Sequence, residues 1–254
     1  MPRTKIVYHE RYLADYPTAS VERPERIIQI HKELVEHGYS FVIPKHADIK
    51  DIHLVHNPDL VSSEMHDKDR YDVSLFSVGG AIMASEMAFS GAPSFALIRP
   101  PGHHASPGSN WGFCFFNNMA IAIERLIVNK KIERAVILDI DLHFGDGTDS
   151  FFAGRDDVTV INVQTSNRLD FLAQCHSGLK AAAPFDIVAV SAGFDRYIKD
   201  WGMTLETEDF RTIGEVVKEF ADKFANNRRF AILEGGYYLP DLGKNARSLI
   251  EGME

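Results

Sequence analysis

Short apolar runs alternate with longer helical segments along the chain, and this alternation constrains the fold more than any other feature. The apolar runs read "KIVY", "SFALI", "RAVILDI", "VTVINV", "DIVAVSA" and "RFAIL". Their length and two-sided apolarity are typical of buried parallel strands. Helices are expected between Pro24 and Gly38 and over residues 74–90, 117–130, 169–181, 207–225 and 241–251. The pattern predicts an α/β fold with a doubly wound, mainly parallel sheet flanked by helices.

Length and charge narrow the class of protein further. The 254 residues are 45% hydrophobic, which suits one large core, and no repeat or linker divides the chain, so we expect a single domain over 1–254. A net charge of -9 without any basic run argues against a nucleic-acid partner. No apolar run is long enough for a membrane span, and two cysteines are too few for a disulfide framework. A cytoplasmic protein without a membrane partner is predicted.

Four of the predicted strands are followed directly by residues whose side chains can bind a metal or transfer a proton. "SFALI" leads into "RPPGHHASPG", "RAVILDI" into "DLHFGDG", "DIVAVSA" into "GFD" and "RFAIL" into "EGGYY". The carboxyl ends of parallel strands meet at one edge of a sheet, and open α/β sheets bind their ligands there. The residues delivered to that edge are His103, His104, Asp141, His143, Asp195 and Tyr237.

These residue types favour a metal-binding site. In an extended chain Asp139, Asp141 and His143 share one face, although sharing a face does not fix a role. Asp141 and His143, joined by Asp195 from a separate strand, supply two carboxylates and one imidazole, a set that Zn²⁺ or Fe²⁺ accepts. The remaining histidines are interpreted as structural residues of the surface or core: His9, His31, His37, His46, His53, His56, His66 and His176.

The motifs also carry a family resemblance. In chain order, "RPPGHHA", "GFCFFNN", "ILDIDLHFGDGT", "SAGFD" and "LEGGY" resemble the signature motifs of the histone deacetylase and acetylpolyamine amidohydrolase family, and "ERPERI" is similar to its N-terminal helix motif. The match runs from about residue 20 to residue 245. It implies an arginase-like α/β fold and metal-dependent hydrolysis of an acetyl-amide, with Asp141, His143 and Asp195 as ligands of Zn²⁺.

The resemblance implies catalytic roles as well. His104 matches the general base and acid, and Tyr237 matches the hydroxyl that donates to the developing oxyanion. Asp146 matches the carboxylate that orients the base. Asp139 matches the partner of His103.

Substrate and ion contacts follow from the same resemblance. Gly112 and Phe113 match a tunnel around the stem of the acylated amine, although Phe113 is equally compatible with a core position. Arg26 matches an arginine on an acetate exit path, with a surface salt bridge as the alternative. The family often holds K⁺ against the backbone around residues 139–143, so K⁺ is a second candidate ion.

The chain also departs from the family pattern. Phe144 and Tyr238 stand where relatives usually carry a histidine and an asparagine. The segment 164–185 is much shorter than in relatives, whose longer segment contributes a glycine-rich loop to the tunnel wall. The short segment predicts a wide, shallow mouth with Phe113 as its main aromatic side.

Three functions remain open from the sequence. The leading hypothesis is a deacetylase acting on an acylated amine such as acetyl-lysine or an acetylpolyamine. The alternatives are a non-catalytic protein that binds a metal or an acyl ligand, and an arginase-type hydrolase with two metals, for which "DIDLHFG" and "SAGFD" lack additional paired aspartates. The sequence does not give the oligomeric state.

Overall fold

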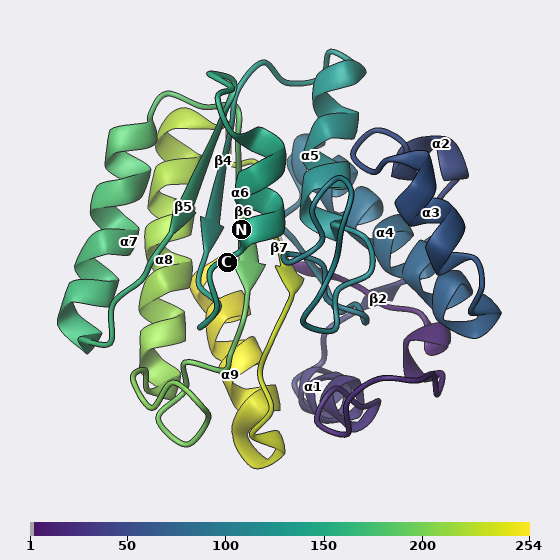
Figure 1. Ribbon diagram of the computed structural model, residues 1–254. Helices are drawn as coiled ribbons and strands as arrows, with labels where there is room; N and C mark the ends of the chain where they lie inside the picture. Colours follow the sequence, from purple (N-terminus) through teal and green to yellow (C-terminus); the bar gives the residue numbers. More distant parts are fainter. Residues whose placement is uncertain (1–2) are drawn as a thin grey trace.

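The computed structural model describes residues 3–254 and contains a seven-stranded sheet with the order β2-β1-β3-β7-β6-β4-β5 (Figure 1). All of its strand pairs are parallel. The strands are Lys5–Val7 (β1), Phe41–Val42 (β2), Ser94–Ala96 (β3), Ala135–Asp139 (β4), Val158–Asn162 (β5), Ile187–Ala192 (β6) and Arg229–Leu233 (β7). The predicted α/β class and the parallel sheet are therefore confirmed.

Helices cover both faces of the sheet (Figure 1). Helices α1, α9, α8 and α7 pack against one another in one layer, and α4, α5 and α6 pack in the other, with α2 and α3 beside them. Their bounds are Glu25–Glu36 (α1), Ile49–Ile52 (α2), Pro58–Glu64 (α3), Lys68–Phe89 (α4), Asn118–Val128 (α5), Asp146–Phe152 (α6), Arg168–Ala182 (α7), Thr207–Phe224 (α8) and Leu239–Gly252 (α9). A short 3-10 helix, Glu10–Leu13, precedes α1.

Burial explains the sequence pattern of the strands. Every residue of β3, β4, β6 and β7 is buried, as a strand covered by helices on both faces requires. Helix α4 begins at Lys68, six residues before the predicted start at 74, because the Asp67 side chain caps it by accepting a hydrogen bond from the Arg70 amide. Within the described residues, no helix combines the length and apolarity that crossing a bilayer needs.

The strand order positions the functional residues. Strands β3, β7, β6 and β4 are consecutive neighbours, and because they are parallel, their carboxyl ends lie at the same edge. The chain leaving each of these ends carries one of the motifs identified in the sequence. A single edge of the sheet thus collects residues that lie more than a hundred positions apart.

Candidate metal and catalytic site

Asp141, His143 and Asp195 come together at this edge. Their candidate ligand atoms all lie within 4.8 Å of one another. His143 Nδ1 is 3.2 Å from Asp141 Oδ1 and 3.1 Å from Asp195 Oδ2. Asp195 Oδ2 is buried and makes no contact of hydrogen-bond geometry with the described residues. An orphaned carboxylate oxygen facing a second carboxylate and an imidazole is the environment that a divalent cation fits.

Backbone amides fix the two carboxylates. Asp141 Oδ1 accepts from the His143 amide at 2.9 Å, and Asp141 Oδ2 accepts from the Gly235 amide at 2.9 Å. Asp195 Oδ1 accepts from the Leu142 amide at 2.9 Å. A Cβ atom on Gly235 would lie 2.6 Å from Asp141 Oδ2, so only glycine permits this approach. The glycines of "EGGYY" thus let the backbone hold Asp141.

The pKa values of the two buried carboxyl groups, Asp195 and Asp141, are shifted in opposite directions. Burial raises the pKa of Asp195 to about 7, and the charge of Asp141 acts in the same direction. Burial also works against the ionised form of Asp141, but the charge of His103 and the hydrogen bonds from His143 lower its pKa overall. Two adjacent buried carboxylates repel each other, so a cation between them would stabilise both. The donor set therefore fits Zn²⁺ or Fe²⁺.

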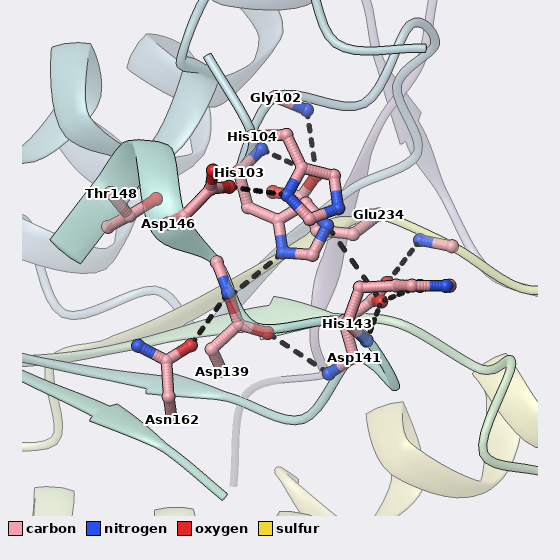
Figure 2. A network of polar contacts seen from close by, with 12 residues as sticks. Gly102, His103, His104, Asp139, Asp141, His143, Asp146, Thr148, Asn162 and Glu234 are labelled. Atoms are coloured by element: carbon pink, nitrogen blue, oxygen red, sulfur yellow. Dashed lines mark hydrogen bonds and ion pairs between the residues drawn. The ribbon is translucent and has the colours of Figure 1, made fainter. Parts of the chain in front are cut away.

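Two histidine–aspartate pairs lie next to Asp141 and His143, as Figure 2 shows. His103 Nδ1 is 3.0 Å from Asp139 Oδ2, and His104 Nδ1 is 2.7 Å from Asp146 Oδ1. Although burial opposes a charged imidazole, Asp141 and Asp139 raise the pKa of His103 well above its usual value. Burial and the neighbouring charge of His103 lower the pKa of His104 to about 4. His104 is therefore the neutral imidazole of the pair, which is the form that accepts a proton.

The loop after β7 places Tyr237 beside the trio. Asp200 Oδ2 accepts hydrogen bonds from the amides of Tyr237 and Tyr238, at 2.6 and 2.7 Å. The Tyr237 ring stacks on Trp201, with centroids 4.2 Å apart and planes at 21°. Burial raises the pKa of Tyr237, so its hydroxyl stays protonated and able to donate. No hydrogen bond within residues 3–254 engages that hydroxyl.

Asp141, His143, His104 and Tyr237 line one small cavity of about 110 Å³, and the third member of the trio, Asp195, is buried behind its lining. Phe113, Trp111 and Trp201 form its aromatic walls. Trp111 packs over His104, with centroids 3.9 Å apart, and its Nε1 donates to Asp146 at 2.8 Å. Phe113 therefore lines the cavity, but the expectation that it is the main aromatic side is wrong. Two tryptophans, 54% and 48% exposed, supply the rest of the wall.

Phe113 and Gly112 reach the cavity through an unusual backbone. Gly112 has a φ of 61°, and a Cβ atom there would lie 2.6 Å from His104 Cδ2. Phe113 has a φ of 70°, in the left-handed region that side-chain-bearing residues rarely adopt. Such conformations persist where the surrounding structure enforces them, and they cluster at ligand sites.

Arg26 is buried, so the alternative of a surface salt bridge is wrong. Its side chain donates to the carbonyl oxygens of Gly236 and Glu234 in the Tyr237 loop. Glu234 in turn accepts from the Gly102 and His103 amides, at 2.7 and 3.2 Å. Arg26 and Glu234 thus connect the histidine loop to the tyrosine loop beneath the cavity.

Comparison with known proteins identifies the family. A model of the histone deacetylase domain matches residues 20–171 and 170–253. The chain belongs to the histone deacetylase family. A probable deacetylase of Methanothermobacter thermautotrophicus is 31% identical over 84% of this chain and 79% of that protein. The mouse polyamine deacetylase HDAC10 is 26% identical over 98% of this chain and 48% of its own length.

A solved structure confirms the histone deacetylase fold. The crystal structure of the HDA15 HD domain superposes with a TM-score of 0.88 at 21% identity, covering 99% of this chain and 89% of that one. The two parts of the histone deacetylase match meet at residues 170–171, inside the segment 164–185. The break agrees with the sequence-based prediction that this histone deacetylase is shortened there.

Sequence reasoning missed several residues around the site of this histone deacetylase. Glu234 and Asp200 lie inside or next to quoted motifs, so their position was a usable signal. Trp111 stands directly before "GFCFF", but nothing in the sequence shows that it packs on His104. Trp201 and Arg196 follow "SAGFD", and only the folded loops reveal their contacts. The eight histidines interpreted as structural all lie outside the cavity lining.

Proposed function

We propose that this chain is a zinc-dependent hydrolase that removes an acetyl or other acyl group from a short acylated amine. The observation that carries the proposal is a carboxylate–imidazole–carboxylate trio whose Asp141 and His143 line the same cavity as a neutral His104 and Tyr237. Membership of a family of deacetylases and amidohydrolases supports the same reaction class. Fe²⁺ is the alternative metal for this donor set.

The residues divide the chemistry among them. When bound by Asp141, His143 and Asp195, Zn²⁺ supplies polarisation of the amide carbonyl and an acidified water. His104 Nε2 takes the proton of the attacking water and returns a proton to the leaving amine, while Asp146 holds the opposite ring nitrogen.

Two further groups complete this mechanism. The Tyr237 hydroxyl donates a hydrogen bond to the oxygen that becomes negative. Asp139 keeps His103 oriented and charged beneath the carboxylates.

The cavity walls favour a small substrate that carries a positive charge. Trp111, Phe113 and Trp201 present aromatic faces at the mouth, and such faces attract alkylammonium groups. The net charge of -9 adds a long-range attraction for cationic amines. We therefore place acetylpolyamines and other short acylated amines ahead of acetyl-lysine in a protein chain. One relative, the mouse HDAC10, is named a polyamine deacetylase, which supports this order.

The two alternatives make distinct predictions. A hydrolase with two metals needs a second set of available ligands, and within residues 3–254 the other candidate cluster is His103, Cys114 and Glu234. In that cluster His103 Nδ1 contacts Asp139 and Glu234 Oε2 accepts two backbone amides, whereas Glu234 Oε1 has no hydrogen-bond partner among the described residues, so a count of bound metal is the measurement that separates one site from two. A protein that only binds a ligand would not need a neutral His104 beside a tyrosine hydroxyl that is free to donate a hydrogen bond. We expect one metal per chain, and turnover.

The direct test is a comparison of substrates. The zinc-loaded protein is assayed with an N-acetylpolyamine, an acetyl-lysine peptide and a lysine with a longer acyl chain, at two ionic strengths. We expect kcat/KM to be highest for the acetylpolyamine at low salt and to fall as salt screens the attraction. Turnover of none of the three would favour the non-catalytic alternative. A strong, salt-independent preference for the peptide would contradict the proposed substrate class.

A cytoplasmic location is part of this proposal. Cys114 and Cys175 are both buried free thiols, which suits a reducing compartment. Fractionation of cells that produce the protein would test it, and recovery outside the cytoplasm would contradict it.

A further inference from the structure

Arg196 is a buried arginine whose guanidinium is surrounded by backbone carbonyls. It directly follows Asp195, and it is 3% exposed. Nε donates to the Asp141 carbonyl at 3.0 Å, and Nη2 donates to the carbonyls of Leu142 and Val163 at 3.2 and 2.8 Å. Nη1 donates to the Thr165 carbonyl at 3.1 Å. One side chain therefore satisfies four carbonyls from two loops.

The stretch around residues 139–143 is also where the family resemblance implies K⁺. A bound K⁺ needs several carbonyl oxygens in place of its hydration shell. Here the carbonyls of Asp141 and Leu142 are directed to the guanidinium of Arg196. A K⁺ ion on the same oxygens would lie next to a buried and permanently charged group, which would repel it. The residues present at this position do not fit K⁺.

We infer that Arg196 is a built-in cation that takes the place of K⁺ in this chain and positions the loop carrying Asp141 and His143. The inference goes beyond the proposed reaction and holds whichever acylated amine is hydrolysed. Arg196 is a positioning residue, because it contacts the backbone of the metal-binding loop and not the cavity.

Charge and shape both suit arginine at this position. Asp139, Asp141 and Asp195 are three buried carboxyl groups close to the guanidinium. A fixed positive charge offsets part of their repulsion without recruiting an ion from solution. The planar fork of arginine donates in several directions at once, whereas the single nitrogen of lysine cannot reach four separated carbonyls.

The shortened segment is part of the same arrangement. Val163 directly precedes this segment and Thr165 lies at its beginning, and the guanidinium lies over the ring of buried Phe171, 4.8 Å from the ring centroid. Residues 170 and 171 are also where the family match divides. Arg196 thus joins the short connection directly to the metal-binding loop.

Thermal unfolding in different salts tests the inference without any need for turnover. The metal-stripped protein is unfolded in potassium chloride and in choline chloride at equal ionic strength. We expect the midpoint of the wild-type protein to be the same in both salts. A midpoint raised specifically by potassium in the wild-type protein would overturn the inference. If Arg196→Ala does not fold, the comparison of wild-type unfolding midpoints in the two salts is sufficient to test the inference.

The variants supply the complementary readout. We expect Arg196→Ala to unfold earlier in choline chloride and to recover by at least about 3 °C with potassium or with millimolar guanidinium. Arg229→Ala is the matched control, because Arg229 is 1% exposed and donates to the Met253 carbonyl at the opposite end of β7. Its loss of stability should not respond to either cation. An Arg196→Ala variant indifferent to both cations would contradict the inference.

Zinc affinity separates positioning from simple stability. In choline chloride, competition with a chromophoric chelator should show Zn²⁺ binding about tenfold weaker in Arg196→Ala than in the wild-type protein. Potassium should restore the affinity of Arg196→Ala, and Arg196→Lys should lie between the two. Equal zinc affinity in Arg196→Ala and wild type would show that Arg196 does not position the metal-binding loop. A protein that binds zinc in this way but hydrolyses nothing would refute only the proposed function.

Discussion

Tyr237 owes its position to residues outside its own motif. Asp200 holds the tyrosine backbone through the amides of residues 237 and 238, and Trp201 packs flat against the ring. The guanidinium of Arg26 also lies over this ring, 4.9 Å from its centroid. The ring is therefore held in place while the hydroxyl remains available. Preorganised donors of this kind account for much of the rate in acyl-transfer enzymes.

Replacing Tyr237 by phenylalanine keeps these ring contacts and removes only the hydroxyl. We expect kcat to fall by about 100-fold or more, because one oxyanion donor is lost. Metal content and the unfolding midpoint should be unchanged. Tyr238→Phe is the control, since the neighbouring tyrosine lies outside the cavity lining. Steady-state kinetics decide the question, and an undiminished kcat would remove Tyr237 from the mechanism.

Trp201 lines the cavity and is half exposed, so the proposed function predicts that it contacts the substrate. Replacing it by alanine should raise KM for a cationic acylated amine by roughly threefold to fivefold, because one aromatic contact with the ammonium group is lost. Trp201→Phe should recover most of the affinity. Ile198→Ala is the control, since Ile198 is exposed on the same loop but does not line the cavity. If the KM values of Trp201→Ala and wild type agree, the aromatic wall does not select the substrate.

The elements predicted from periodicity were those whose burial pattern is simple. Six strands were recognised because both of their faces are apolar, and α7 was predicted to within about one residue at each end. Five short elements were not predicted: the 3-10 helix Glu10–Leu13, β2, α2, α3 and α6. They have two to seven residues, which is too short for a hydrophobic period to develop.

Only those site residues that belong to a recognisable sequence motif could be predicted. The meeting of His104, Asp141 and Tyr237 follows from parallel strands ending at one edge, so sequence order was sufficient. Trp111 and Arg196 were not predictable, because their roles depend on how loops from different strands approach one another. A tryptophan before a glycine, or an arginine after an aspartate, has no periodicity that indicates its partner.

His56 illustrates a histidine that supports the elements around the site. Its Nε2 accepts from the Asn117 amide at 2.8 Å, at the start of α5, and Nδ1 is 3.0 Å from the Ser106 carbonyl. Burial lowers the pKa of His56 to about 4. Unfolding restores a pKa near about 6.5, so protons favour the unfolded chain.

Acid should therefore weaken the fold through His56. Its contribution is complete above about pH 6.5 and declines as pH falls toward about 4, by a total of about 3 kcal/mol. Denaturant unfolding of wild type and His56→Gln between pH 7 and pH 4 measures the difference, which should shrink as the pH falls. His66→Gln is the control, because this exposed histidine touches none of the His56 contacts. A difference that is independent of pH would contradict the assignment.

At the scale of the whole molecule, the site places a concentration of buried charge at the edge of the sheet. Burial, together with the neighbouring charge of Asp141, raises the pKa of Asp195 to about 7 in the metal-free protein. A bound cation should therefore stabilise the entire fold. Adding Zn²⁺ at about 1,000 times its Kd should contribute about 4 kcal/mol.

Calorimetry of the stripped protein with and without Zn²⁺ measures this gain. The midpoint should rise by about 8 °C or more. Asp195→Asn should show a much smaller rise, because the variant lacks one ligand and the repulsion it relieves. A midpoint unaffected by Zn²⁺ would mean that the three side chains do not form a metal site.

The central claim is that one divalent ion, held by Asp141, His143 and Asp195, supports amide hydrolysis. Its most direct test is to titrate Zn²⁺ into the stripped protein while measuring both bound metal and hydrolysis of an N-acetylpolyamine. We expect activity to rise linearly and to reach a plateau at one equivalent, with Asp195→Ala losing bound metal and activity together. A plateau at two equivalents, or tight binding of one ion without turnover, would contradict the claim.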